Sequence, residues 1–273
     1  MCSSDLIDLY GGRLRVSSQQ LETGLSGASR AEDAEIAART VEPLRILLAG
    51  QTGAGKSSLV NALANEVQAV VDPLPATAGF IPYDLRKEGF PSARLIDTPG
   101  LGPSPETNEA LVGNARNCDL VLWIVAAHRA DREIDRLALM ALRDGFAAMP
   151  DRRVPPILLV LSQIDRLRPF QEWMPPYDLA STDRPKAVSI RAAIDAAAED
   201  LKFELHDVVP VNLAAGATYN IDALWAAIDM ALPQAQRAKL VRQLQDAKSN
   251  WSWRQVWSQA AEAGRVLGRT LRP

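Results

Sequence analysis

The chain has 273 residues, of which 47% are hydrophobic and 23% charged, and its formal net charge is −3. These values are ordinary for a globular protein, and the absence of excess basic charge argues against a general nucleic-acid binder, so we expect no DNA binding. Two cysteines, Cys2 and Cys118, are too few for a disulfide framework or a zinc site. No apolar run reaches the roughly 18 residues of a membrane span, and the first residues lack a signal-peptide pattern, so we expect a cytoplasmic protein.

Residues 1–42 are rich in small and polar residues and are expected to form a linker with one short helix, because Ser29 and Glu32 have capping-box spacing. From residue 43 onward, short apolar runs alternate with helical periods. Strands are expected over 44–49, 93–96, 120–126, 157–161 and 208–211, and helices over 56–65, 106–117, 131–146, 187–203 and 222–232, the last ending at Pro233. This alternation predicts an α/β domain over 43–233, doubly wound, with a mostly parallel sheet and helices on both faces.

The first predicted strand leads directly into GQTGAGKS, which fits the phosphate-loop pattern G-x-x-x-x-G-K-[ST]. Its glycines allow successive N–H groups to face phosphate oxygens, and the following helix directs its N-terminal dipole toward the same anion. The lysine is expected to bridge the β- and γ-phosphates, and the final serine to ligate Mg²⁺. The nucleotide-binding residues expected here are Gly50, Gln51, Thr52, Gly53, Ala54, Gly55, Lys56, Ser57 and Ser58.

A second motif, Asp97-Thr98-Pro99-Gly100, follows the predicted strand at 93–96. An acidic residue at the end of a strand beside a phosphate loop suits an outer ligand of Mg²⁺, and Gly100 leaves its backbone N–H free to approach the γ-phosphate.

With these two motifs, GQTGAGKSSLVNAL and DTPG, the chain resembles the translation-factor-class P-loop GTPases, in their Era-like and septin-like branch. The resemblance implies a Mg²⁺-dependent GTP- and GDP-binding domain that hydrolyses GTP. Thr77 fits the family's second motif and would ligate Mg²⁺ together with Ser57 and Asp97. Catalytic roles would fall to Lys56, Thr77 and Gly100.

The family's fourth motif, Asn/Thr-Lys-x-Asp, corresponds here to Ser162-Gln163-Ile164-Asp165. The Asp165 carboxylate can accept hydrogen bonds from two guanine N–H groups that adenine lacks, so it is expected to select guanine. Ser162 and Gln163 depart from the family pattern and predict a weaker site. The fifth motif is reduced to Asn212 and Leu213, whose backbone N–H can still reach the guanine O6.

Hydrolysis is expected to be slow. The position where many relatives carry a water-orienting Gln is Leu101, and the position of a potassium-recruiting Asn is Gly53. Arg86 and Arg129 are the candidates for an arginine finger, although an exposed Arg is more often surface charge. The leading interpretation is therefore a slow GTPase switch. The alternatives are a GTP-binding scaffold with little turnover and an ATP-using P-loop enzyme.

Residues 234–273 are expected to form a basic amphipathic helical tail. Over 235–273 the formal charge is +6, against −9 for the rest of the chain. Trp251, Trp253 and Trp257 lie among the cations, a pattern that suits a membrane interface or a groove on an effector protein. A peripheral membrane location would follow from the first of these. The alternative is that this helix packs back onto the GTPase domain with its basic side in water.

Overall fold

The structure is a computed structural model that describes residues 42–67, 80–87, 89–102, 104–181 and 183–250. The chain divides into two units, residues 1–42 and Pro43–Pro273, and all described residues except Glu42 belong to the second. The predicted N-terminal helix, Thr77 and the three tryptophans of the tail lie outside the described residues.

Six strands form one sheet in the order β2-β3-β1-β4-β5-β6. All neighbouring pairs are parallel except β2 and β3, which are antiparallel. The strands are β1 (Leu44–Ala49), β2 (Ile81–Leu85), β3 (Ala93–Asp97), β4 (Leu120–Ala126), β5 (Ile157–Ser162) and β6 (Val208–Pro210). The predicted doubly wound, mostly parallel sheet is confirmed.

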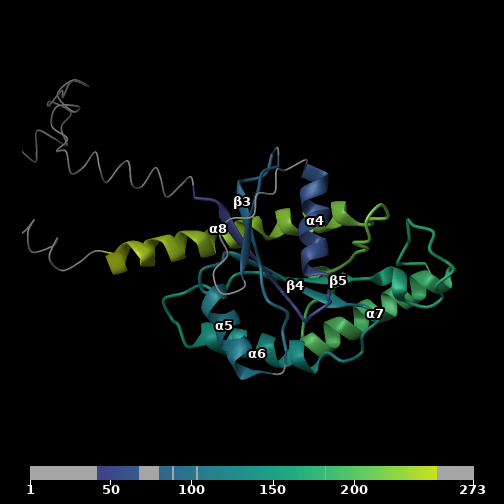
Figure 1. Ribbon diagram of the computed structural model, residues 1–273, viewed down its shortest axis with the longest axis horizontal. Helices are drawn as coiled ribbons and strands as arrows, with labels where there is room; N and C mark the ends of the chain where they lie inside the picture. Colours follow the sequence, from purple (N-terminus) through teal and green to yellow (C-terminus); the bar gives the residue numbers. More distant parts are fainter. Residues whose placement is uncertain (1–41, 68–79, 88, 103, 182, 251–273) are drawn as a thin grey trace, which may run out of the picture. The chain divides into compact units, whose positions relative to one another are not determined.

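Helices cover both faces of this sheet (Figure 1). One apolar cluster lies under α5 (Pro105–Ala115), α6 (Glu133–Ala147) and α7 (Pro185–Leu201), and the other under α4 (Lys56–Val67) and α8 (Ile221–Asn250). Strand residues alternate between the two clusters: Leu47, Val121 and Leu159 face the first, whereas Leu48, Leu122 and Val160 face the second. Strands buried on both faces explain the continuous apolar runs in the sequence. Two single-turn 3₁₀ helices, Ile164–Arg166 and Leu205–Asp207, complete the described elements.

Two features differ from the sequence-based expectation. The edge strand β2, which contains Pro82 and Asp84, was not predicted, because its residues are mostly half-buried and it shows no apolar run. Helix α8 was expected to end at Pro233 but continues through it to Asn250, so that expectation is wrong.

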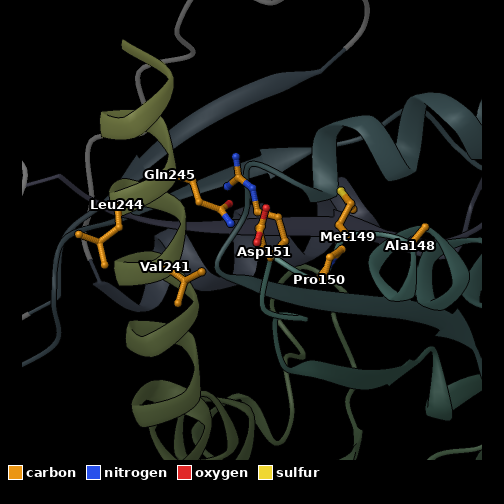
Figure 2. Close-up of a pocket in the computed structure, with 8 residues that line it drawn as sticks. Ala148, Met149, Pro150, Asp151, Val241, Leu244 and Gln245 are labelled. Carbon is orange, nitrogen blue, oxygen red and sulfur yellow. The ribbon is translucent and has the colours of Figure 1, made fainter. Parts of the chain in front are cut away.

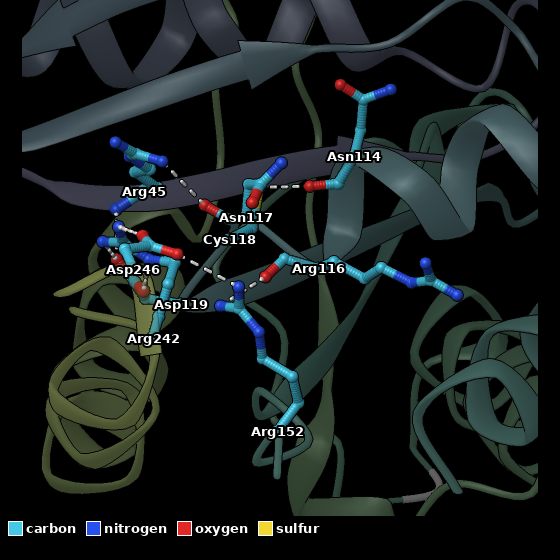
Figure 3. Close-up of polar contacts among 9 residues, drawn as sticks. All are labelled: Arg45, Asn114, Arg116, Asn117, Cys118, Asp119, Arg152, Arg242 and Asp246. Atoms are coloured by element: carbon cyan, nitrogen blue, oxygen red, sulfur yellow. Dashed lines mark hydrogen bonds and ion pairs between the residues drawn. The ribbon is translucent and has the colours of Figure 1, made fainter. Parts of the chain in front are cut away.

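The continuation of α8 past Pro233 packs onto the domain. Ala235 and Ala238 are buried, and the Arg242 guanidinium donates from Nε to Asp119 Oδ1 at 2.9 Å (Figure 3). Asp119 directly precedes β4 and also accepts the backbone N–H of Arg45 at 2.9 Å. Arg242 and Asp119 are 2% and 0% exposed, so each supplies an opposite charge close to the other's buried charge. Arg242 Nη1 also lies 3.7 Å from Asp246 Oδ2. The first part of the predicted tail, to about residue 246, is therefore a docked helix.

A hollow of about 780 Å³ lies between this part of α8 and the segment after α6 (Figure 2). Its lining includes Met149, Pro150, Val241 and Leu244. None of the residues that line it belongs to the sequence motifs, which lie at the carboxyl ends of the strands.

Candidate functional site

The predicted site residues gather at the carboxyl edge of the sheet, where parallel strands end side by side. Residues 50–57 follow β1, 98–101 follow β3, 163–166 follow β5 and 212–218 follow β6, while Asp97 and Ser162 are the last residues of β3 and β5. Open α/β sheets bind ligands at this edge.

The phosphate loop has a backbone that only glycine can adopt at key positions. Gly50 has φ +148°, and a Cβ there would lie 2.0 Å from the carbonyl oxygen of Ile124 in β4. Gly53 and Gly55 have φ +76° and +106°. Because side chains are strained at such angles, these glycines hold the loop against the sheet and deliver it into the first turn of α4.

Lys56, the first residue of α4, folds its side chain back over the loop. Its Nζ donates to the carbonyl oxygens of Gly50 at 3.0 Å and Gln51 at 3.2 Å, and the residue is 7% exposed. Burial lowers the pKa of Lys56, while attraction to Asp97 and Asp135 works against that shift. The ammonium is thus a cation held at the loop with only backbone oxygens as acceptors.

Ser57 and Asp97 form a pair that fits Mg²⁺. The Ser57 hydroxyl donates to Asp97 Oδ2 at 2.8 Å, and Asp97 Oδ1 is buried without a hydrogen-bond partner among the described residues. An unpartnered buried carboxylate oxygen beside a hydroxyl suits a hard cation that prefers oxygen ligands. No group of three or more His, Cys, Asp or Glu that could hold a metal occurs in the described part of the chain. Phosphate oxygens and water would have to complete the coordination.

The segment after β3 is fastened to the phosphate loop. The Thr98 hydroxyl donates to the carbonyl oxygen of Leu48 at 2.8 Å, and the Leu101 N–H donates to that of Gly50 at 3.0 Å. Gly100 packs so closely on Thr52 that a Cβ at Gly100 would lie 2.1 Å from its Oγ1. The Leu101 side chain is 3% exposed and belongs to the apolar cluster under α5 and α6, so it cannot orient a water molecule.

A buried carboxylate behind the loop was missed by sequence reasoning. Asp135 of α6 is 2% exposed and accepts hydrogen bonds from Gln51 Nε2 at 2.8 Å and Trp123 Nε1 at 3.0 Å. Burial raises the pKa of Asp135, and these two hydrogen bonds limit the rise. In the sequence, Asp135 looks like an ordinary exposed acid on an amphipathic helix, so its contact with Gln51 is apparent only in the structure.

The two unusual residues of the fourth motif both contact the phosphate loop. Ser162, fully buried at the end of β5, places its hydroxyl 2.5 Å from the carbonyl oxygen of Ala54 and 3.1 Å from that of Val125. Gln163, in a left-handed conformation with φ +57°, donates from Nε2 to the carbonyl oxygen of Gly53 at 2.9 Å. The departures from the family pattern therefore retain a bracing contact with the loop.

Asn212 and Leu213 shape the other side of the expected base site. The Asn212 side chain donates to the carbonyl oxygen of Ala217 at 2.8 Å and accepts the N–H of Ala214 at 3.1 Å, which closes the loop between them. Leu213 packs beside Gly55. A cavity of about 520 Å³ opens between this loop and Ser58 of α4, within the size range of ligand sites.

Asp165 lies half-buried in the 3₁₀ turn that follows β5. The carbonyl oxygen of Asp165 accepts a hydrogen bond at 2.7 Å from Lys186, a fully buried lysine at the start of α7. Sequence reasoning did not single out Lys186, since nothing in its neighbourhood distinguishes it from a surface lysine.

The two arginine candidates lie at opposite edges of the sheet. Arg86 follows β2, whose last residue pairs with Ala93 at the start of β3, so Arg86 stands at the edge away from the phosphate loop. Arg129 lies at the correct edge and donates from Nη1 to the carbonyl oxygen of Thr52 at 2.8 Å. His128 is exposed beside it, with its pKa lowered by partial burial and by Arg166 and Arg129.

This geometry agrees with the comparison to known proteins. Residues 45–161, from β1 to the end of β5, match the family described as 50S ribosome-binding GTPase. Over these residues the chain is similar to P-loop GTPase domains of the translation-factor class. Its assignment to the Era-like and septin-like branch stays a prediction.

Similar curated proteins and solved structures match this chain at low identity or over only part of its length. The tRNA modification GTPase MnmE of a Methylobacterium species is 40% identical over 118 residues, 38% of this chain and 27% of the relative. MnmE of a Synechocystis species is 29% identical over 231 residues, 80% of this chain and 46% of the relative. A crystal structure of Era with MgGDPNP and a segment of 16S ribosomal RNA has a TM-score of 0.45 at 19% identity, covering 68% of this chain and 56% of that one. The chain thus spans less than half the length of these two curated relatives.

Proposed function

We propose that this chain binds GTP and GDP together with Mg²⁺, hydrolyses GTP slowly and acts as a molecular switch. The observation that supports this most is the pairing of Ser57 with Asp97 beside the phosphate loop, with Asp97 Oδ1 left unpartnered. Phosphate-loop enzymes place a hydroxyl and a strand-end carboxylate at this point to hold Mg²⁺ on the β- and γ-phosphates.

In this proposal the backbone N–H groups of residues 50–57 and the Lys56 ammonium neutralise the phosphates. Bound Mg²⁺ would supply further charge neutralisation, held by Ser57 and Asp97 and, outside the described residues, by Thr77. Gly100 would present its N–H to the γ-phosphate. Asp165 would accept the two guanine N–H groups, with Leu213 supplying a backbone N–H to the O6.

We expect slow turnover because the two positions that orient the attacking water or recruit potassium in relatives lack a suitable side chain here. Phosphoryl transfer depends on positioning the attacking water and stabilising charge. Leu101 is buried in the core and Gly53 carries no side chain, so neither supplies a group for the water. We expect intrinsic turnover on the order of 10⁻⁴ to 10⁻² s⁻¹, as for unassisted small GTPases.

Single-turnover hydrolysis of radiolabelled GTP, measured alongside nucleotide affinity, tests this function. The expected result is tight Mg²⁺-dependent binding, slow release of phosphate and similar rates in potassium and sodium buffers. Turnover of tens per minute in sodium would show that a catalytic group has been missed. Tight binding with no phosphate release over many hours would favour the scaffold alternative instead.

We also propose that residues beyond the docked part of α8 reach a protein effector or an anionic membrane surface at the cell's cytoplasmic side. The support is the concentration of basic residues and tryptophans in the sequence after residue 246. No helix among the described residues is long and apolar enough to cross a bilayer. Liposome sedimentation of the full chain and of a version ending at Asn250 distinguishes the two partners, since only membrane binding makes the full chain sediment with anionic vesicles.

A further inference from the structure

Lys186 is fully buried although it lies beside the loop that follows β5. We propose that Lys186 is a positioning residue that sets guanine selectivity by fixing the turn on which Asp165 is carried. This inference rests on the proposed recognition of guanine by Asp165, and it adds a residue that the sequence motifs do not include.

The ammonium of Lys186 contacts three carbonyl oxygens in one short stretch of backbone. Its Nζ donates to the carbonyl oxygen of Asp165 at 2.7 Å, to that of Leu167, and to that of Pro169 at 3.4 Å. An ammonium has three N–H donors, so this stretch uses all of them. These contacts hold the backbone of Asp165 and of the residues that follow it. They therefore fix the position of the backbone that carries the Asp165 carboxylate.

The same ammonium connects the fourth motif to the fifth through aromatic rings. Nζ lies 5.7 Å from the ring centre of Trp173, within the range of a cation–π contact. Trp173 packs edge-on against Tyr219 with ring centres 5.8 Å apart. Tyr219 exchanges backbone hydrogen bonds of 2.9 and 3.2 Å with Asn212. One buried cation therefore ties together the two segments expected to contact guanine.

Burying an ammonium raises the free energy of the folded state unless its N–H groups are hydrogen-bonded. The three carbonyl contacts of Lys186 therefore indicate that this segment is built to hold it. Burial lowers the pKa of Lys186, and attraction to Asp165 and Glu172 opposes that effect. Its hydrogen bonds go to backbone carbonyls, so an apolar residue of similar length would fill the space but release the turn. A role confined to stability would lower the amount of folded protein and leave the choice between bases unchanged.

The test compares the affinities of GDP and inosine diphosphate, in the presence of Mg²⁺, for the wild-type chain and for Lys186→Met. Inosine diphosphate lacks the guanine 2-amino group and so lacks one of the two donors to Asp165. We expect the wild type to prefer GDP, and Lys186→Met to lose about tenfold of that preference. Lys186→Gln is a milder change, because the amide keeps two N–H donors, and it should lose part of the GDP preference. It replaces Lys186→Met in the test if that variant does not fold.

Two further variants separate positioning from stability. Ile190→Ala removes a buried side chain on the same helix, and it should lower the melting temperature while keeping the GDP preference. Asp165→Ala should abolish the preference, and adding Lys186→Met to it should cost nothing more in selectivity. A folded Lys186→Met or Lys186→Gln variant with unchanged preference would overturn the inference. A wild type without any preference would instead refute the proposed guanine site.

Discussion

The phosphate side and the base side of the proposed nucleotide site are built by different means. On the phosphate side, glycines with positive φ, the N-terminus of α4 and the Ser57–Asp97 pair follow the family pattern residue by residue. On the base side the pattern is broken at Ser162 and Gln163, yet both side chains still contact carbonyl oxygens of the phosphate loop. Backbone geometry tolerates few residue types, whereas a bracing hydrogen bond can come from several. A departure in sequence is therefore not always a departure in contact.

The largest effect should come from the phosphate side. Lys56→Ala removes the cation at the loop, and we expect GTP affinity to fall by roughly 100-fold or more, because lost charge-assisted contacts of this kind cost about 2–5 kcal/mol. Equilibrium titration with a fluorescent GTP analogue measures the change. Arg153→Ala is the matched control, because Arg153 is an exposed cation just before β5, at the opposite edge of the sheet.

On the base side, Ser162→Ala should have an intermediate effect. It removes the buried hydroxyl that reaches Ala54 and Val125, and we expect about 1–3 kcal/mol of lost stability, since a buried carbonyl loses its donor. Chemical denaturation measures the free energy of unfolding, and GDP titration should show weaker binding as the loop loosens. If stability and affinity are both unchanged, Ser162 does not brace the loop and the comparison between the two sides fails.

Restoring the family residue at position 163 should have a small effect. Gln163 already donates to the Gly53 carbonyl oxygen, so Gln163→Lys is expected to change GDP affinity by less than about fivefold, within 1 kcal/mol. Gln163→Ala, which removes the donor, should weaken binding more than Gln163→Lys strengthens it. A gain of 100-fold with lysine would show that the departure at this position does weaken the site.

The sheet beneath both sides should show almost no change when nucleotide binds. Cys118 is buried, and burial with the neighbouring Asp119 raises its pKa to about 12. Because the thiolate is the reactive form, alkylation in a Cys2→Ser variant should be very slow at pH 8 in the native state, with or without GDP, and rapid in denaturant. Fast native alkylation would mean that the sheet edge at Cys118 opens in solution.

Much of this fold could be predicted from the sequence because parallel strands buried on both faces leave continuous apolar runs. β2 could not, since Ile81–Leu85 includes a proline and an aspartate and is a strand by virtue of pairing with β3. The continuation of α8 through Pro233 also could not be predicted from the sequence, because the Asp119–Arg242 contact that holds it joins residues 123 positions apart. Among the site residues, loop glycines and Ser57 were apparent from spacing. The contacts of Asp135 and Lys186 were not, because a buried charge has no local signature.

Nucleotide competition against labelled GDP tests the central claim most directly, namely that this site selects guanine despite its altered fourth motif. With Mg²⁺ present, unlabelled GTP should displace the label from the wild type at concentrations at least about 100-fold lower than ATP, because adenine lacks the donors for Asp165. In Asp165→Ala that advantage should largely disappear. Equal displacement by GTP and ATP from the wild-type chain would contradict the account.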